Sequence, residues 1–184
     1  TDMGEDGKSG ALHSTMGRDV YSFTLGYHGS DYKPIGTTSA PAFGLGYQSP
    51  SSLSSGNGLY NGNISFATTA LNTISTGNTI GYSYGYDQLN RLTEMRYHDG
   101  LTGNDWNNTS ISDNYKEQIS YDANGNILTY LRNGNQAVNT AMDNLTYHYK
   151  NGTNQLSSIS DNVAAGNYPQ DIDNQGADNY TYDR

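Results

Sequence analysis

A nine-residue motif, Tyr-x-Tyr-Asp-x-x-Asn-Arg-Leu at positions 84–92, recurs in degraded form three more times along this chain. Its second tyrosine falls at four positions that are 35, 28 and 33 residues apart: Tyr86, Tyr121, Tyr149 and Tyr182. Self-similarity with a period of about 20–50 residues is the signature of a repeat architecture, in which each copy is one supersecondary unit. We therefore expect a stack of similar units, and the last copy is truncated.

Each copy predicts a β-hairpin. In the first, Ile80 and the tyrosines at 82, 84 and 86 fall on one face of a strand, and small residues fall on the other. Asp87 and Asn90 are turn formers, because their side chains bond nearby backbone amides and tolerate a positive φ. The return strand is Arg91–His98. Two further hairpins are predicted in the same way: Lys116–Asp122 with Ile127–Arg132, and Asn144–Lys150 with Gln155–Ser160.

The motif residues are assigned a structural role as a ladder in which cross-strand aromatic residues stabilise each hairpin against its neighbour. These residues are Tyr84, Tyr86, Asp87, Asn90, Arg91, Leu92, Tyr121, Asp122, Gly125, Asn126, Ile127, Tyr147, Tyr149, Leu156, Tyr182 and Asp183. An alternative stays open, in which the same tyrosines form an exposed ledge that grips carbohydrate or peptide.

Outside the motifs, two regions are distinguished. Residues 1–58 are expected to be irregular and rich in Gly, Ser and Pro, with strands at Asp19–His28 and Ala42–Tyr47. Residues 59–184 carry the repeats, opened by an Asn-Gly turn at 61–62 that leads into a strand. Two polar stretches are expected to be loops between hairpins: Asp99–Asn114 and Asp161–Asp178.

Composition supports an all-β chain of many turns, with 17 tyrosines and 22 glycines among 184 residues. A net charge of −9 argues against binding to nucleic acid or to an anionic membrane surface. Without cysteine, the chain has no disulfide and no thiol chemistry. No apolar run is long enough to predict a membrane span. Because the sequence stops within a motif and lacks an initiating Met, we interpret it as a window from a longer protein.

Catalytic and metal-binding patterns are weak. Gly81-x-Ser83-x-Gly85 matches the nucleophile-elbow string, but that motif needs a turn from strand to helix, and none is predicted here. The stretch from Asp171 to Gly176 is similar to the start of a calcium loop but lacks its later ligands. The paired acids Asp99 and Asp105 have no predicted apolar pocket. The four histidines show no metal-binding spacing: His13, His28, His98 and His148. We expect no enzyme activity, cofactor or metal.

The Tyr-Asp units resemble the YD repeats of the bacterial RHS family, which teneurin shells share. The likeness lies in Tyr86-Asp87-x-x-Asn90-Arg91-Leu92, in Tyr121-Asp122-x-x-Gly125-Asn126-Ile127 and in the segment Tyr60–Ser65. The third copy departs from the pattern, with Lys150 in place of Asp and one extra turn residue.

This resemblance implies a spiralling β-sheet that closes into a hollow shell around a C-terminal effector, usually a toxin. The implied partners are the rest of the shell, the enclosed effector and a secretion or delivery component, in a secreted or cell-surface bacterial protein. An alternative is a surface adhesin that binds glycan or peptide through exposed tyrosines, Trp106 and the two polar loops. Hairpins alone would leave open sheet edges, so we expect stability only within a larger assembly.

Overall fold

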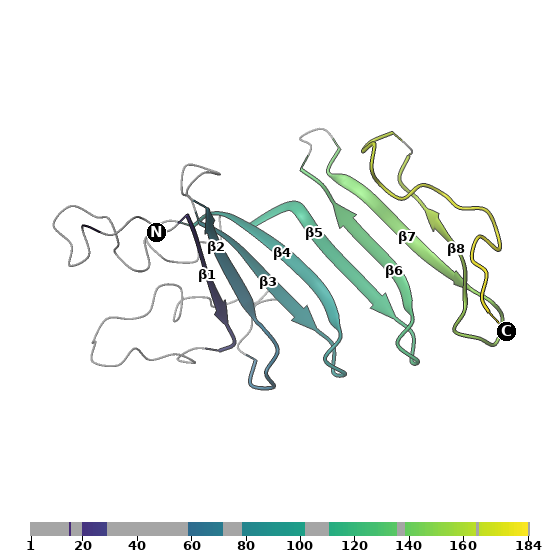
Figure 1. The fold of residues 1–184 in the computed structure, drawn as a ribbon, viewed down its shortest axis with the longest axis horizontal. Coiled ribbons are helices and arrows are strands. Elements are labelled where there is room, and N and C mark those ends of the chain that lie inside the picture. Colours follow the sequence, from purple (N-terminus) through teal and green to yellow (C-terminus); the bar gives the residue numbers. More distant parts are fainter. Residues whose placement is uncertain are drawn as a thin grey trace.

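The computed structural model describes residues 15, 20–28, 59–71, 79–101, 111–135, 139–164 and 166–183. Within these ranges the chain is all-β, as predicted, and contains no helix. Eight strands form one antiparallel sheet (Figure 1): β1 (Tyr21–Gly26), β2 (Phe66–Leu71), β3 (Thr79–Tyr86), β4 (Leu92–Leu101), β5 (Ile111–Tyr121), β6 (Ile127–Asn133), β7 (Ala141–Tyr149) and β8 (Leu156–Asp161).

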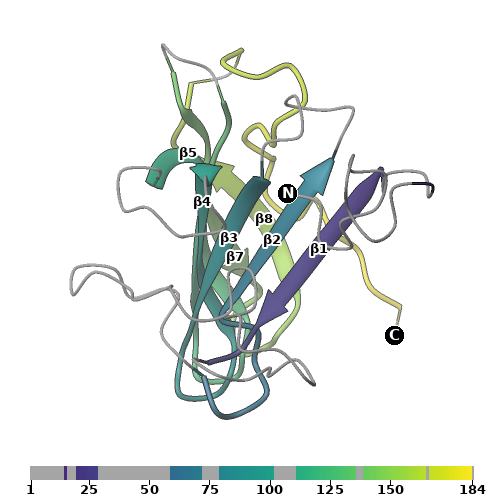
Figure 2. The same cartoon turned by 90° about the vertical axis from the view of Figure 1, so that its left-hand side faces the viewer.

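The strands follow one another across the sheet in sequence order, so every strand pairs with its neighbours along the chain. This arrangement is what successive hairpins produce, because short turns can join only adjacent antiparallel strands. The view in Figure 2 shows that the strand direction rotates from β1 across the sheet. Such rotation is the ordinary twist of β-sheets. No long-range crossover is needed to build the fold.

The predicted loop at Asp99–Asn114 is too long. Strand β4 continues to Leu101, β5 begins at Ile111, and His98 lies directly opposite Ile111. The polar composition of this stretch led to the prediction of a loop, although Leu101 and Ile111 supply apolar side chains at the two strand ends. The strand expected at Ala42–Tyr47 lies outside the described residues, as does most of the region 1–58. The strand expected at Asp19–His28 is present as β1.

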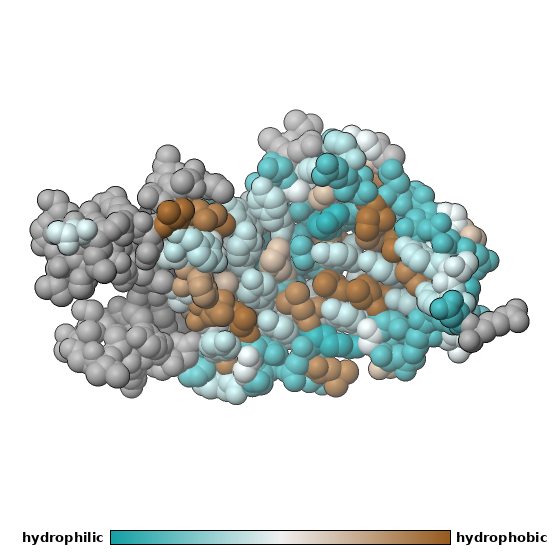
Figure 3. All heavy atoms as spheres, viewed as in Figure 1, coloured by the Kyte–Doolittle hydropathy of each residue, from teal (hydrophilic) through white to brown (hydrophobic). Residues whose placement is uncertain are grey.

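The sheet buries opposite faces in its two halves. In β3 the small side is buried, and Ser83 is 0% exposed. In β7 the buried residues are Asp143 and Leu145, at 1% each. Cross-strand register places Asp143 on the face of Tyr84, which is opposite to that of Ser83. Because the buried face changes between the two halves, the described sheet does not have the single continuous apolar layer of a simple β-sandwich. Figure 3 shows that the apolar side chains of one face form separate patches.

The outer edge of β8 is covered by an irregular stretch, residues 172–182, which we call the edge segment. Gln175 N–H donates to the Ile159 carbonyl (3.0 Å), and Ile159 N–H donates to the Gln175 side-chain carbonyl (3.1 Å). Asp161 N–H donates to Asn174 Oδ1 (2.9 Å), and Asn179 N–H donates to the Ser157 carbonyl (2.8 Å). The expectation of an open edge is therefore wrong for β8. The predicted polar loop lies along the strand and satisfies its backbone.

Candidate functional site

Four tight turns lie along one end of the strands, at the lower side of the sheet in Figure 1. They span residues 60–64 and the connections β3–β4, β5–β6 and β7–β8. We call these four turns the turn row. Of the sixteen motif residues predicted from the sequence, fourteen lie in the turn row or in the strands that enter and leave it. A fifteenth, Tyr182, packs against the turn row from the edge segment. The last, Asp183, is exposed beyond the edge segment.

The aspartate of the motif organises each of the two middle turns. Asp87 Oδ1 accepts the N–H groups of Leu89 (2.9 Å) and Arg91 (3.0 Å), and Arg91 Nε donates to Oδ2 (2.6 Å). These bonds to Arg91 and Leu89 favour the ionised carboxylate and lower the pKa of Asp87. The backbone amides of Leu89 and Arg91 are thus hydrogen-bonded within the turn. All the partners of the Asp87 carboxylate in these bonds lie within four residues of it in the sequence.

Asp122 repeats this arrangement in the next turn. Its Oδ1 accepts the N–H groups of Asn124 (2.9 Å) and Asn126 (2.8 Å), and Asn126 Nδ2 donates to Oδ2 (2.8 Å). The side chain of Asn126 is the main cause of the lowered pKa of Asp122. In the third motif Lys150 stands in place of the aspartate. There Thr153 takes over, donating its hydroxyl to the Lys150 carbonyl (2.9 Å).

Each turn requires one residue in the left-handed region of backbone space. The φ angles are 62° at Asn90, 92° at Gly125 and 71° at Gly152. Glycine adopts this conformation without steric cost, and asparagine tolerates it better than other residues do. The turn at 60–64 has the same feature, with φ of 87° at Gly62. The spacing of Asn and Gly in the sequence therefore follows from backbone geometry.

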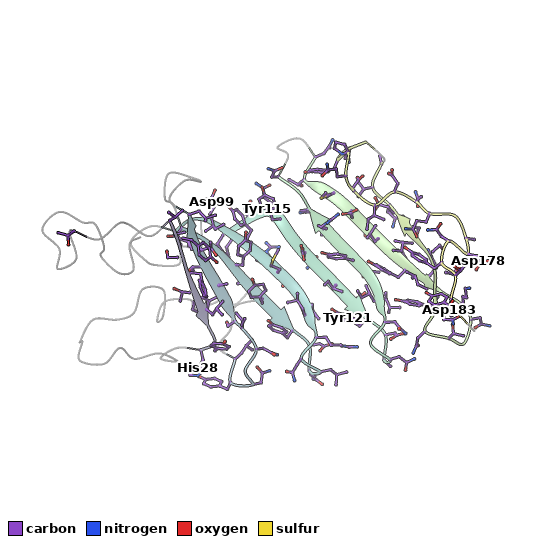
Figure 4. All side chains as sticks on the ribbon, in the orientation of Figure 1. His28, Asp99, Tyr115, Tyr121, Asp178 and Asp183 are labelled. Atoms are coloured by element: carbon purple, nitrogen blue, oxygen red, sulfur yellow. The ribbon has the colours of Figure 1, made fainter. Side chains whose placement is uncertain are left out.

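The second tyrosine of each motif joins its own hairpin to the one before. Its hydroxyl donates to the backbone carbonyl of the residue that closes the preceding turn. The four bonds are Tyr86 to Ile64 (3.0 Å), Tyr121 to Leu92 (2.8 Å), Tyr149 to Ile127 (2.8 Å) and Tyr182 to Leu156 (3.0 Å). The rings of the first three are half-buried between neighbouring units, and Figure 4 shows Tyr121 at the turn end of the strands.

Side chains in the turns add a second connection between units. Asn63 Nδ2 donates to Asn90 Oδ1 (3.1 Å), which links the first turn to the second. Arg91 Nη1 donates to the Asp122 carbonyl (2.9 Å), and its guanidinium lies 4.7 Å from the centre of the Tyr121 ring. The second and third turns are thereby joined. Every contact in this chain of links runs from one motif to the next.

The third and fourth turns are joined in the same way, since Asn126 Nδ2 donates to Asn154 Oδ1 (2.9 Å). The first tyrosines of the motifs, Tyr84 and Tyr147, lie inward of the turn row and are half-buried. Burial is the main cause of the raised pKa of both hydroxyls. The turn row thus supplies no exposed set of acid, base and nucleophile. The side chains of the turn row instead bind the neighbouring hairpin.

One buried polar pair was not predicted from the sequence. Ser83 Oγ lies 2.8 Å from His98 Nε2, and these residues are 0% and 1% exposed. Burial, followed by the charge of Arg96, lowers the pKa of His98 to about 4. The hairpin register places Gly81 opposite His98, so Ser83 and His98 are diagonal neighbours. A regular register extended from the predicted turn would place Ser83 and His98 on opposite faces, and the register shift between Gly85 and Tyr86 brings them onto the same one.

This pair lacks the features of a nucleophile and base. Ser83 sits in the middle of β3, opposite Phe66 on one side and Arg96 on the other. A nucleophile elbow instead places its serine on an exposed turn between strand and helix. The hydrogen bond gives partners to two buried polar groups, which otherwise carry a desolvation cost.

The other predicted candidates are dispersed. His28 stacks on Tyr60, with ring centres 4.5 Å apart, and His148 Nε2 lies 2.8 Å from Ser160 Oγ. The calcium-like string lies in the edge segment, where the side chain of Gln175 is bound to β8 and to Tyr180. The described residues contain no cluster of three metal-ligating side chains. Three candidates lie outside the described residues: His13, Asp105 and Trp106.

Comparison of the chain with models of known protein families, with curated proteins and with solved structures gives no match in any of the three. In the part of the chain that the structure describes, no helix is long and apolar enough to cross a membrane. The family resemblance of the motifs therefore rests on the residues themselves.

Removing one tyrosine hydroxyl of the ladder is expected to destabilise the sheet. We predict that Tyr121→Phe lowers the free energy of unfolding by about 1 kcal/mol, the usual net worth of one hydrogen bond. The ring and its packing against Arg91 remain, so the change isolates the bond to Leu92. Chemical denaturation monitored by circular dichroism measures the effect.

The matched control is Tyr60→Phe, at a tyrosine that is 83% exposed in the first turn. Its free energy of unfolding is expected to equal that of the wild type. Equal losses in Tyr60→Phe and Tyr121→Phe would contradict a specific role for the hydroxyl that meets Leu92.

The buried histidine predicts a pH dependence. The pKa of His98 is about 4 in the folded chain against 6.5 in the unfolded chain, so unfolding takes up a proton between these values. The free energy of unfolding should therefore fall as pH falls from 6.5 to about 4. In His98→Asn this slope should be shallower, as measured by urea midpoints across the pH range.

The control is His148→Asn, at an exposed histidine that also contacts a serine. It should retain the wild-type slope. An unchanged slope in His98→Asn would show that this histidine does not titrate on unfolding.

Proposed function

We propose that the chain is a non-catalytic wall segment of an RHS/YD-repeat shell. The observation that carries the proposal is the ladder of tyrosine hydroxyls, each bound to the carbonyl that closes the preceding turn of the turn row. A bond of this kind extends a sheet one hairpin at a time, because every unit presents the carbonyl that the next tyrosine needs. On this proposal, the repeated motif positions each hairpin beside the preceding one and so builds a long sheet.

A shell wall of this kind suits an enclosing function. The contacts that define it run within the sheet, so its length is set by the number of motifs. In the proposed protein the sheet continues beyond these residues and surrounds a C-terminal effector, which is kept away from solvent until delivery. The implied setting is a large secreted or cell-surface bacterial protein with a delivery component.

The two rival functions have less support. An enzyme that uses Ser83 would need access to that side chain, which is 0% exposed. An adhesin that uses the motif tyrosines as a ledge would need exposed rings, but those of Tyr86, Tyr121 and Tyr149 are half-buried and held by hydroxyl bonds to backbone carbonyls. The structural role of the ladder explains these contacts without a ligand.

Limited proteolysis of the natural polypeptide that contains this sequence tests the proposal. We predict that its C-terminal portion resists a protease that is added outside, and becomes cleavable when mild denaturant opens the sheet. Tyr121→Phe should lower the denaturant concentration at which cleavage begins, because it weakens the proposed wall. Mass spectrometry of the fragments measures both effects.

Two results would contradict an enclosing shell. In one, the natural polypeptide has no further domain. In the other, the further domain is cleaved in native buffer as fast as when it is expressed alone.

A further inference from the structure

A cavity of about 300 Å³ lies at the end of the sheet opposite the turn row, around the starts of β5 and β7 and the end of β6. Figure 4 labels Tyr115 on this side of the sheet, while Tyr121 lies at the other end of β5. The lining comes from three strands, the β6–β7 connection and the loop after β8: Tyr115, Glu117, Arg132, Asn133, Gly134, Asn135, Met142 and Tyr168. None of these residues belongs to the repeated motif.

One aromatic wall of the cavity, the ring of Tyr168, packs directly against Gly134. A Cβ atom at this position would lie 2.4 Å from the ring of Tyr168, so only glycine lets that ring lie against the backbone. Tyr168 is 8% exposed, and its hydroxyl donates to the Asn139 carbonyl (2.9 Å). This wall is consequently fixed before any ligand arrives.

Tyr115 is held in a strained conformation at the mouth of the cavity. Its φ is 54°, a value that bulky residues rarely adopt, and its N–H donates to the Gly134 carbonyl (3.2 Å). Its side chain is still 41% exposed. Backbone strain of this kind is concentrated at ligand-binding and other functional positions. Tyr97, whose ring centre is 5.2 Å away, supports the Tyr115 ring edge-on.

The polar lining offers both hydrogen-bond donors and acceptors. Glu117 and Arg132 face each other across β5 and β6, and Arg132 Nε also donates to the buried Asp143 (2.6 Å). Asn133 is fixed by a bond from its amide to the Asp113 carbonyl (2.8 Å). The one guanidinium of the lining is thus shared by two carboxylates, those of Glu117 and Asp143, so the site does not favour an anion. The ligand that matches this lining is neutral and rich in hydroxyl groups.

We propose that this cavity binds one neutral sugar ring, as a terminal hexose or N-acetylhexosamine of a glycan. Such a ring has a face of C–H groups, which fits the exposed ring of Tyr115, and a rim of hydroxyls that need donors and acceptors. Arg132 supplies donors and Glu117 acceptors. The volume lies at the lower end of ligand pockets, which span about 300–1,000 Å³, so the site accepts a single small unit. The proposal is independent of the shell function and uses no motif residue.

Ligand-observed NMR with the folded chain tests this site. The probes are methyl hexosides and N-acetylglucosamine, with glucuronate as a charged comparison. We expect saturation transfer to ring protons of at least one neutral probe, with affinity near 1 mM, a typical weak single-site value of about −4 kcal/mol. Glucuronate should show none, because Arg132 is already paired with Asp143 and faces Glu117, whose carboxylates repel another.

Tyr115→Gly is the decisive variant, because glycine accepts the positive φ and only the ring is lost. It should retain the circular dichroism spectrum of the wild type, yet bind the neutral probe roughly tenfold more weakly. The control, Tyr60→Ala, removes another exposed ring far along the sequence and should bind as the wild type does. Three results would overturn the proposal: no transfer to any neutral probe, unchanged binding in Tyr115→Gly, or binding of glucuronate alone.

Discussion

The hydrogen bond from the second motif tyrosine to the carbonyl that closes the previous turn is the interaction on which the sheet depends. At the turn end of each hairpin the strand register shifts, as between Ser120 and Tyr121 in β5. Tyr121 then lies opposite Ile127 in its own hairpin and donates to Leu92 in the hairpin before. The tyrosine side chain therefore fixes the position of the neighbouring unit, while Asp122 beside it holds the local turn. The same shift occurs before Tyr86 and Tyr149.

These bonds matter because the apolar core is small. The buried apolar side chains in the described part of the chain include Leu145 and Ile159 on the later strands and Phe66 on β2. Much of the remaining buried surface is polar, including Ser83 and Asp143. Polar groups away from water need partners, and in this chain the partners are supplied by turns, tyrosine hydroxyls and the edge segment. In this sheet, hydrogen bonds therefore specify the alignment of the strands more than apolar packing does.

The hairpins were predictable because their information is local. Asp87 and Asn90 specify a turn within a few residues, and period-two alternation specifies the strands on either side. What could not be predicted depends on contacts between segments. The sequence of the edge segment predicts a polar loop, and its cover of β8 depends on contacts that the fold creates: the side chains of Asn174 and Gln175 and the backbone amides of Gln175 and Asn179 all bond to that strand. The cavity likewise brings together Tyr115 and Tyr168, which are 53 positions apart in the sequence.

Hydrogen–deuterium exchange resolved by residue tests the ladder most directly. In Tyr121→Phe, compared with the wild type, the account predicts faster exchange of the amides that pair β4 with β5, where the hydroxyl meets Leu92. The β7–β8 hairpin, which is held by its own tyrosine at Tyr149, should keep its protection. Uniform acceleration across the sheet, or no change at the β4–β5 boundary, would contradict the view that each hydroxyl joins one hairpin to the next.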